Sequence, residues 1–405
     1  MNKELRSLDI TFSTKFNYIP ISDRYLMDRQ QAAHRFNIIG AGVNGQEHIR
    51  VTMLEGRSTI HGIYDPNASS VAAAQHEYAL YAPTEALTIY DSLEAACMDP
   101  AVDGLVICTP NYTHLDVVKE AIKSGKHILL EKPIATTLAD AHTIMQIAEQ
   151  YDAIFQIGLQ YRYKAIYAES IYEALERKTL GNLQTLTILE HRVPFMDKVS
   201  QWNKFSKFSG NTLIEKCCHY FDLFNLFAQS RPVSVFATGS MAVNFTHFEY
   251  NGEKSDILDN AMVIVNYASG VTANFNLCMF APMIYEELVI CGDEARLKAW
   301  ENEDFLPEQK AGTHLEIIAG ENKPSRVMTP MYPASIQRTG HHGATYFEHV
   351  DFVDNIEGRP TKSPSARDGF WSIAVAAAAQ ESITTGRVVL IEDMLASTGI
   401  DPTQV

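Results

Sequence analysis

The sequence predicts an α/β protein with two domains: a first domain built on a parallel sheet, and a second, α+β domain with an open, mostly antiparallel sheet. Two patterns predict this fold. Up to residue 158, short apolar runs alternate with helical stretches, as in βαβ units, whereas later extended segments follow one another through turn signals. The chain of 405 residues is also too long for one ordinary core.

The first domain is expected over residues 35–158. Its predicted strands, which are short and apolar, are 36–39, 59–64, 104–108, 127–130 and 153–157. Helices are predicted between them at 45–54, 68–77, 92–98, 115–124 and 138–151. Strands that alternate with helices of this length form a parallel sheet with helices on both faces.

The second domain is expected over residues 159–405. A helix at 165–177 precedes predicted strands at 183–192, 233–239, 261–267, 271–280, 286–291 and 295–300. Helices at 212–228 and 366–385 interrupt and close this sheet, and the last helix is placed where it can pack back on the first domain. Residues 1–34 are polar and aromatic, and we expect either an arm on a neighbouring surface or a disordered tail.

Composition and charge exclude several classes of protein. With 46% hydrophobic and 20% charged residues, the chain has the composition of a soluble globular protein. It has no apolar run near the roughly 18 residues of a spanning helix, and its first residues lack a secretory-signal pattern, so we expect a cytoplasmic protein. The net charge of −16 argues against a nucleic-acid partner, because phosphate binding requires clustered Lys and Arg.

The cysteines predict neither a disulfide framework nor a metal site. They are scattered without paired spacing, at Cys97, Cys108, Cys217, Cys218, Cys278 and Cys291. Two of them adjoin His219, but two cysteines and one histidine are one ligand short of a structural zinc site. We therefore expect reduced cysteines that pack in the core, and no bound metal.

A glycine motif at the first strand–helix junction predicts a dinucleotide site, and hence a Rossmann domain. Gly40, Gly42 and Gly45 have the spacing G-x-G-x-x-G, with Val43 and Asn44 inside the motif. The first glycine permits a tight turn, the second lets the backbone approach a pyrophosphate, and the third lets helix and strand pack closely. Free amides at the helix N-terminus would then bind the phosphates.

Asp65 ends the second predicted strand and bears on the choice of cofactor. It lies about 25 residues after Gly40, near the place of the acid that hydrogen-bonds a ribose 2′-hydroxyl. A carboxylate there repels a 2′-phosphate, which favours NAD, with NADP as the alternative. An aspartate that only begins a turn before Pro66 would be compatible with both.

Two further segments end strands at the same edge of the sheet. Residues 109–114 supply Thr109, Pro110, Asn111 and His114, at the edge where open α/β sheets bind ligands. His114 either caps the cofactor site or only begins a helix. In the second segment Glu131, Lys132 and Pro133 follow an apolar strand, and the proline restricts Lys132 to one backbone conformation. Lys132 is therefore either a structural ion-pair member or a catalytic group.

Together these motifs resemble those of the Gfo/Idh/MocA family of NAD(P)-dependent oxidoreductases. The resemblance rests on the glycine motif, "TPNYTH", "EKP" and "GNTLIEKCCHYFDLF", and it runs from about Arg35 to the C-terminus. It implies a Rossmann domain, an open-sheet domain and a sugar or cyclitol bound between them. It places Lys132 near the nicotinamide and the reacting hydroxyl. The family's Asp-x-x-x-His-x-x-Asp helix corresponds to Glu215, His219 and Asp222, with Glu where many members have Asp.

The spacing of this last motif agrees with a catalytic role. Glu215, His219 and Asp222 are four and three residues apart, so they can share one side of a helix. A carboxylate beside His219 would raise the basicity of the imidazole, which is then the candidate base for the hydroxyl proton. Lys132 would stabilise negative charge on the same oxygen, and we expect burial to lower its pKa.

The substrate site is expected to draw on two more segments. Tyr161 and Arg162 follow the domain junction, and Trp202 lies on a loop before His219. Aromatic faces and charged hydrogen-bonding groups suit a polyhydroxylated ring, although some of these residues would serve equally well as core packing. His341 and His342 begin a predicted helix and either reach the cleft or cap the surface.

The resulting hypothesis is a dehydrogenase or reductase that moves a hydride between NAD and a secondary hydroxyl of a sugar, sugar derivative or inositol. One alternative is a glycosidase that oxidises its sugar transiently and eliminates a substituent. Another is a cofactor-sensing regulator without activity. The family resemblance also implies association into a homodimer or homotetramer through the open face of the second sheet.

Overall fold

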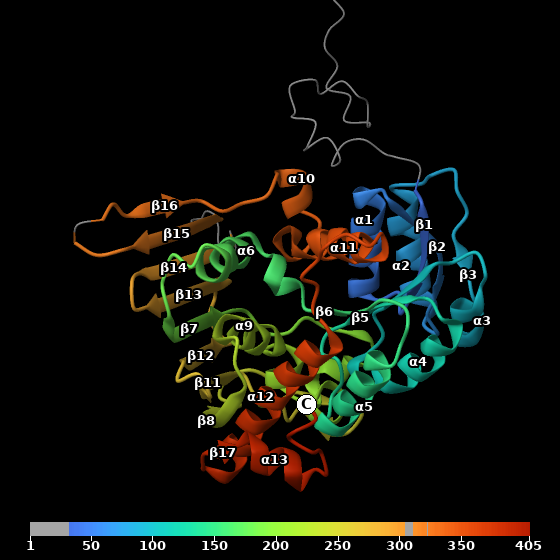
Figure 1. Cartoon of the computed structure of the whole chain (residues 1–405). Coiled ribbons are helices and arrows are strands. Elements are labelled where there is room, and N and C mark those ends of the chain that lie inside the picture. The colour runs from blue at the N-terminus through green and yellow to red at the C-terminus, as the bar shows by residue number, and fades with distance from the viewer. Residues whose placement is uncertain (1–31, 304–310, 322) are drawn as a thin grey trace, which may run out of the picture.

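Two sheets, each covered by helices, make up the protein (Figure 1). The computed structural model describes residues 32–303, 311–321 and 323–405, so most of the predicted arm at 1–34 lies outside the described residues. Among the helices in these ranges, none combines the length and the apolar character needed to cross a bilayer.

The first domain contains the predicted parallel sheet. Its strands are β1 His34–Ile39, β2 Ser58–Tyr64, β3 Thr88–Ile89, β4 Gly104–Ile107, β5 His127–Glu131 and β6 Phe155–Gly158. They lie in the order β3-β2-β1-β4-β5-β6, and every neighbouring pair is parallel. The strand order changes direction between β1 and β4, and the carboxyl ends of strands at such a point form a ligand crevice.

Helices cover both faces of this sheet, as expected. They are α1 Val43–Glu55, α2 Ala68–Ala79, α3 Leu93–Met98, α4 His114–Ala121 and α5 Leu138–Glu149. Three of them begin at a capping side chain: Asn67 accepts hydrogen bonds from the next turn of α2, as Ser92 does for α3 and Thr137 for α5. In contrast, α1 begins at Gly42, whose lack of a side chain leaves the first amides of the helix uncapped.

The second domain is built on a nine-stranded sheet in the order β16-β15-β14-β13-β7-β12-β11-β8-β17. The strands are β7 Leu183–His191, β8 Pro232–Ser240, β11 Asn260–Tyr267, β12 Thr272–Cys278, β13 Tyr285–Gly292, β14 Arg296–Asn302, β15 Gly312–Ile318, β16 Arg326–Met328 and β17 Val389–Leu390. The prediction of a mostly antiparallel sheet is confirmed, with β7 and β12 as the parallel pair. A separate hairpin joins β9 Glu249–Tyr250 and β10 Glu253–Lys254.

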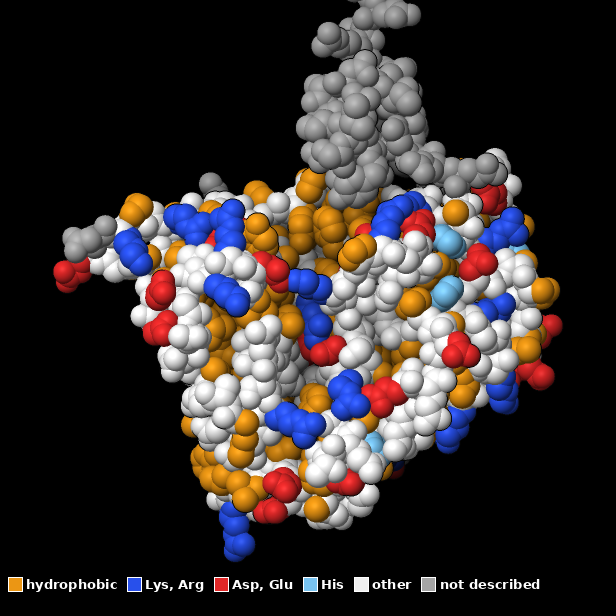
Figure 2. All heavy atoms as spheres, in the orientation of Figure 1, with side chains coloured by type: hydrophobic (Ala, Val, Ile, Leu, Met, Phe, Trp, Pro, Cys, Tyr) orange, Lys and Arg blue, Asp and Glu red, His pale blue; other side chains and the backbone are white. Residues whose placement is uncertain are grey.

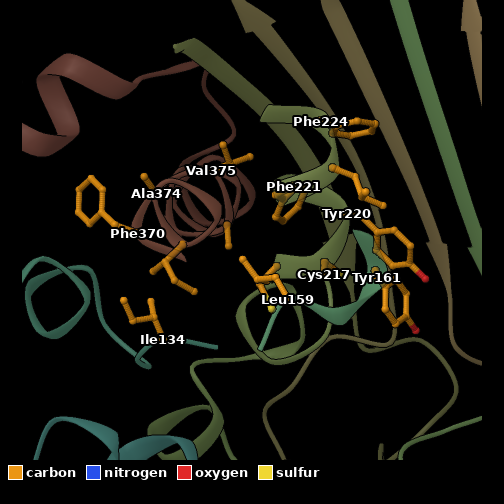
Figure 3. Close-up of a cluster of buried hydrophobic side chains, with 14 of the residues drawn as sticks. Ile134, Leu159, Tyr161, Cys217, Tyr220, Phe221, Phe224, Phe370, Ala374 and Val375 are labelled. Carbon is orange, nitrogen blue, oxygen red and sulfur yellow. The ribbon is translucent and has the colours of Figure 1, made fainter. Parts of the chain in front are cut away.

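Within the described residues, helices cover one face of this large sheet and leave the other uncovered. The helices on the covered side include α6 Ala165–Ile171, α9 Cys218–Ala228 and α12 Ala366–Thr385, the last of which has the predicted bounds and a capping box at Ser365. In Figure 3, α12 runs between Ile134 of the first domain and Phe221 of α9, and Phe370 and Ala374 lie on the side of the helix away from Phe221. The apolar core therefore continues from one domain into the other.

The helix predicted over 212–228 is not continuous. It is divided into α8 Thr212–Glu215 and α9, with Lys216 and Cys217 between them. The amide of Cys217 bonds the carbonyl of Thr212 rather than that of Leu213, so the two helical pieces differ in register. The predicted helix over 165–177 is also modified, because α6 continues as a π-helical turn, Tyr172–Glu176.

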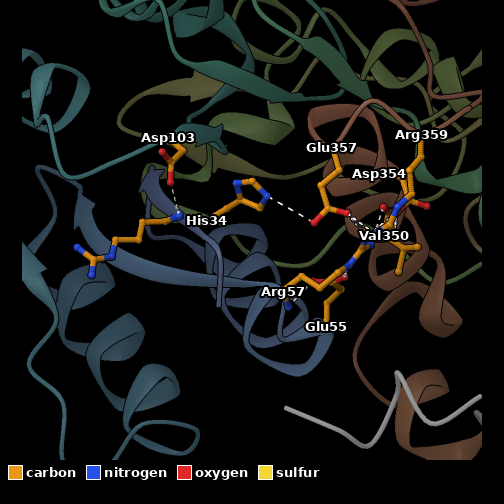
Figure 4. Close-up of polar contacts among 9 residues, drawn as sticks. His34, Glu55, Arg57, Asp103, Val350, Asp354, Glu357 and Arg359 are labelled. Atoms are coloured by element: carbon orange, nitrogen blue, oxygen red, sulfur yellow. Dashed lines mark hydrogen bonds and ion pairs between the residues drawn. The ribbon is translucent and has the colours of Figure 1, made fainter. Parts of the chain in front are cut away.

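After the large sheet, the chain returns to the first domain. The short helix α10 Ala334–Gln337 leads into α11 Ala344–Ile356, which lies against α1. Two other short helices are α7 Ser206–Ser209, which lies between β7 and β8 in the sequence, and α13 Ile391–Ser397, which follows β17. Figure 4 shows how α11 is held: Arg57 pairs with Asp354 at 2.5 Å and Glu357 at 3.0 Å, and it donates to the carbonyl oxygen of Val350. Residues far apart in sequence thus form one wall of the first domain.

Candidate active site

A cavity of about 440 Å³ lies at the carboxyl ends of the parallel strands, where the first domain faces the second. In the space-filling view, side chains of both charges gather around the depression between the two halves (Figure 2). The predicted residues that line the cavity are Gly40, Gly42, Val43, Asn44, Asp65, Thr109, Pro110, Asn111, Glu131, Lys132, Trp202 and Glu215. The structure therefore brings most of the predicted cofactor residues together with two from the substrate domain.

Each glycine of the motif has a different environment, as its predicted role requires. Gly40 has a φ of +94°, which places the turn after β1 in the left-handed region. A Cβ added to Gly42 would meet no atom of the described residues within 4 Å, whereas one added to Gly45 would lie 2.2 Å from the carbonyl oxygen of Gly40. Gly42 therefore leaves space for a ligand, and Gly45 permits close packing behind the loop.

Asp65 lies at the edge of the cavity with its carboxylate anchored from the backbone. It accepts hydrogen bonds from the amides of Ala41 at 2.8 Å and Asn67 at 2.7 Å. Asn67, Ser69 and Ser70, which the sequence analysis did not single out, also line the cavity. Their position directly after the acidic residue is a signal that could have identified them.

The segment after β4 contributes unequally to the site. Asn111 reaches across to the second domain, where its side-chain amide donates to the carboxylate of Glu215 and to the carbonyl of Ser209. His114 does not line the cavity. It is buried, its two ring nitrogens lie 2.9 Å and 3.0 Å from the carbonyl oxygens of Pro133 and Thr109, and burial lowers its pKa. His114 therefore connects two loops beneath the cavity instead of capping the cofactor site.

Lys132 follows β5 and extends toward the second domain. Its ammonium donates to the backbone carbonyl of Glu215 at 3.1 Å, and its amide donates to the carboxylate of Glu131 at 3.0 Å. Burial acts to lower the pKa of Lys132, but the negative charges of Glu215 and Glu131 outweigh it and raise the pKa above the ordinary value. The expectation of a lowered pKa is wrong, so Lys132 is an ammonium donor in this structure.

The expected contact between Glu215 and His219 is absent, because the break between α8 and α9 turns the two side chains apart. The Glu215 carboxylate instead contacts Asn111 and the Lys198 ammonium, the latter at 3.2 Å. Burial raises the pKa of Glu215, but Lys198 and Lys132 lower it further, and the net shift is downward. Glu215 is therefore an anion held between cations and an amide.

His219 is a buried, neutral imidazole. Its ring stacks on Tyr161 with centroids 4.0 Å apart, and its Nδ1 atom has no hydrogen-bond partner among the described residues. Burial, followed by the positive charges of Lys132 and Lys216, lowers the pKa of His219 well below its ordinary value. The expectation that a carboxylate raises its basicity is wrong, but a neutral imidazole with a free nitrogen can accept a proton.

Tyr161, Arg162, His219 and Asp222 were expected to contact substrate, but none of them is among the residues that line the cavity. Arg162 and Asp222 instead pair with each other. The guanidinium donates to both oxygens of Asp222, at 2.7 Å and 2.5 Å, and also lies 3.1 Å from Asp368 of α12. Burial raises the pKa of Asp222 to about 6, and Arg162 opposes that shift. This ion pair joins the segment after β6 to α9 and α12, because each charge needs a partner when it is removed from water.

A network of buried charges behind His219 could not be recognised from sequence. Lys216 donates to the hydroxyl of Tyr161, and Lys164 pairs with Glu286 at 2.9 Å and Glu301 at 2.8 Å. The two glutamates lie on β13 and β14, more than a hundred residues after Lys164. The available signal was an acidic residue at an inward position of each alternating strand.

The predicted histidines at 341 and 342 begin α11 through a short turn, His341–Gly343. His341 pairs with Glu47 of α1 at 2.8 Å, and His342 contacts Glu301 at 3.2 Å and Glu303 at 2.6 Å. Both imidazoles thus pair with carboxylates and connect the start of α11 to neighbouring elements. Trp202, in contrast, lines the cavity as predicted, with the Lys198 ammonium 4.5 Å from its ring centre.

Comparison with known proteins gives matches along most of the chain. A family model described as "Oxidoreductase family, NAD-binding Rossmann fold" matches residues 34–159, and its companion, "Oxidoreductase family, C-terminal alpha/beta domain", matches residues 172–391. Inositol 2-dehydrogenase of Rhizobium meliloti (strain 1021) is 25% identical over 88% of this chain and 99% of its own length. Myo-inositol 2-dehydrogenase of Thermotoga maritima is 22% identical over 89% of this chain and 99% of its own length.

Solved structures agree on the fold. The structure of levoglucosan dehydrogenase in complex with NADH and levoglucosan has a TM-score of 0.73 and 18% identity, and it covers 88% of this chain and 99% of that one. A myo-inositol dehydrogenase structure from Sinorhizobium meliloti 1021 has a TM-score of 0.68 and 22% identity over 89% of this chain and all of that one.

Proposed function

The chain belongs to the Gfo/Idh/MocA family of NAD-binding oxidoreductases, and on this premise we propose that it transfers a hydride between NAD and a secondary hydroxyl or ketone of a sugar, sugar derivative or inositol. One observation carries the proposal: a single cavity joins the glycine loop to Lys132 and Glu215. The inositol dehydrogenases to which the chain is similar support the substrate class.

The residues of the first domain fit a dinucleotide. The open space at Gly42 and the uncapped start of α1 suit a pyrophosphate, and the Asp65 carboxylate suits a ribose with a free 2′-hydroxyl. When bound, NAD supplies the carbon that accepts or returns the hydride. We take residues 35–158 as the cofactor domain and 159–405 as the substrate domain, with α11 returning to the former.

Two side chains are assigned to the proton and charge of the reacting oxygen. The neutral imidazole of His219 is assigned to accept the hydroxyl proton. The Lys132 ammonium donates a hydrogen bond to the same oxygen and stabilises its developing negative charge. Glu215 positions Lys132 and Asn111, since its backbone carbonyl and its carboxylate contact the two residues respectively.

The experiment that tests this function is a screen of sugars and inositols with NAD and NADP, followed at the nicotinamide absorbance. We expect NADH to form with at least one substrate, and a preference for NAD over NADP. Release of an aglycone without net NADH change would support a glycosidase instead. Binding of NAD without turnover of any compound would support a regulator.

The protein is further proposed to act in the cytoplasm as a homodimer or homotetramer. All six cysteines lie in the described ranges as free thiols, a state that the reducing cytoplasm maintains. On the open face of the large sheet, Phe236, Met262 and Ile264 are 41%, 60% and 44% exposed, and Phe236 and Ile264 are cross-strand neighbours. Such an apolar group suits the self-complementary contact of a second copy.

Association is tested by placing a charge on this face. Met262→Glu is expected to shift the protein to a 45 kDa monomer in sedimentation velocity experiments, because an unpaired carboxylate would be buried in the contact. Met98→Glu, at an exposed methionine of α3, is the matched control and should leave the assembly unchanged. A wild-type chain that sediments only as a monomer at micromolar concentration would contradict the proposed association.

A further inference from the structure

Three ligand-type side chains converge at the floor of the cavity, and one of them, Glu131, also lines it. They are His48 of α1, Glu131 at the end of β5 and Glu348 of α11. One nitrogen or oxygen atom of each lies within 4.8 Å of the others, and the three residues are only 1%, 3% and 0% exposed. The cluster thus brings two carboxylates and one imidazole into a space closed to water.

Within the described part of the chain, Glu348 is the member of the cluster whose buried carboxylate has no partner to compensate its burial. Neither of its carboxylate oxygens has a hydrogen-bond partner among the described residues, although both are buried. Burial, followed by the charge of Glu131, raises the pKa of Glu348 well above its ordinary value. A buried carboxylate without a partner is costly, so this space needs either a cation or a proton to compensate it.

The surroundings of His48 are those of a metal ligand. Its Nε2 atom faces the carboxylate of Glu131 at 2.8 Å, and its Nδ1 atom lies 2.7 Å from Nε2 of His349. His349 in turn places Nδ1 3.2 Å from the hydroxyl of Thr52. If Nε2 of His48 binds a cation, Nδ1–H donates to His349, which donates to Thr52. This outward chain of hydrogen bonds is the arrangement that fixes ligating histidines.

Glu131 is also held from outside the cluster. Its second oxygen accepts a hydrogen bond from the amide of Lys132 at 3.0 Å, which leaves the first oxygen directed at His48. Ligand atoms around a tetrahedral ion with bonds of about 2.1 Å lie roughly 3.4 Å apart. The Nε2 atom of His48 and the facing oxygen of Glu131, now 2.8 Å apart, would move apart by about 0.6 Å. The ligand atom of Glu348, which lies within 4.8 Å of both, would move inward by about 1.4 Å or less.

We propose that His48, Glu131 and Glu348 form a binding site for a divalent transition-metal ion, for which Zn²⁺ and Mn²⁺ suit the nitrogen and oxygen donors. Two carboxylates balance the charge of such an ion. The site would connect α1, β5 and α11, and so hold the returning helix on the cofactor domain and Glu131 in place beside Lys132. This proposal revises the expectation of no bound metal. That expectation rested on the absence of closely spaced ligands in the sequence, and positions 48, 131 and 348 are far apart in it.

The test measures metal content and stability, and needs no enzymatic activity. The full chain, purified without chelator, is analysed by inductively coupled plasma mass spectrometry, then stripped with a chelator and titrated with Zn²⁺ or Mn²⁺ alone. We expect one equivalent per chain, a lower melting temperature after stripping, and recovery on titration. Glu348→Gln should weaken metal binding at least tenfold and remove the effect of the chelator on melting.

A matched control and a second variant keep the test decisive. Glu357→Gln removes a carboxylate just after α11 but outside the cluster, and should bind metal like the wild type. If Glu348→Gln does not fold, His349→Asn removes the outer hydrogen bond and should weaken binding by about 10-fold to 100-fold. Protein that contains no metal, binds neither ion and melts identically with chelator would overturn the site. Equal binding by wild type and Glu348→Gln would do the same, because the ion would then lie elsewhere.

Discussion

The two glycines Gly42 and Gly45 offer a matched pair of substitutions that separates cofactor binding from folding. A Cβ on Gly45 would lie 2.2 Å from the carbonyl oxygen of Gly40, and that atom is backbone, which cannot rotate away. A Cβ on Gly42 would meet no described atom within 4 Å, and φ of −66° at Gly42 suits alanine. The same added methyl group therefore has opposite consequences at positions three residues apart.

The magnitudes follow from these contacts. A carbon and an oxygen normally approach to no closer than about 3.2 Å, so Gly45→Ala forces a shift of about 1 Å and should lower the free energy of unfolding by about 1–3 kcal/mol. Gly42→Ala should leave that free energy unchanged or raise it by about 0.4–1 kcal/mol. Its methyl group would instead occupy the space of the pyrophosphate, and we expect the Kd for NAD to rise at least tenfold, or about 1.4 kcal/mol.

Urea unfolding of the cofactor-free proteins and calorimetric titration with NAD measure the two effects separately. Wild-type NAD affinity in Gly42→Ala would show that the pyrophosphate does not approach the loop at this glycine. An unchanged urea midpoint in Gly45→Ala would show that the loop and α1 accommodate the added methyl group without loss of unfolding free energy. Either result would refute the reasoning for that position.

Two predictions concern stability. Arg162→Met should lower the free energy of unfolding by about 3–5 kcal/mol, because it leaves the buried carboxylate of Asp222 unpaired. Adding Asp222→Asn to this variant should recover part of the loss. An Arg162→Met protein with a urea midpoint near that of the wild type would contradict the role of the pair. At His342, burial lowers the pKa, but Glu301 and Glu303 raise it overall from 6.5 to about 9. This stabilisation, about 3 kcal/mol, should be complete below pH 6.5 and lost as the pH rises through 9. Unfolding free energies of wild type and His342→Asn should therefore converge between these pH values, and a constant difference would contradict the pairing.

Local sequence signals were sufficient for the first domain. The glycine spacing, the apolar strands and the turn residues after each strand identified five of its six strands and most of the cavity lining. The missed strand, β3, has only two residues, too few to display a pattern. The residues of this domain that line the cavity lie at or just after the ends of its strands in the sequence, so a local sequence pattern predicts them.

Predictions that depended on side-chain partners were less successful. Helical spacing placed Glu215 beside His219, but the break at Lys216 and Cys217 separates them. The run of aromatic and charged residues after the domain junction placed Arg162 at the substrate, whereas its guanidinium pairs with Asp222, sixty residues away on α9. Burial and pairing of charges are set by tertiary contacts between distant segments, and these contacts leave no spacing in the sequence.

The central claim is that Lys132 and His219 act on one substrate oxygen beside the nicotinamide, and single-turnover hydride transfer tests it most directly. With NAD saturating and the best substrate from the screen, Lys132→Met and His219→Asn should each slow NADH formation by about 100-fold or more, with little change in the Kd for NAD. Two variants that transfer hydride at the wild-type rate would contradict the claim.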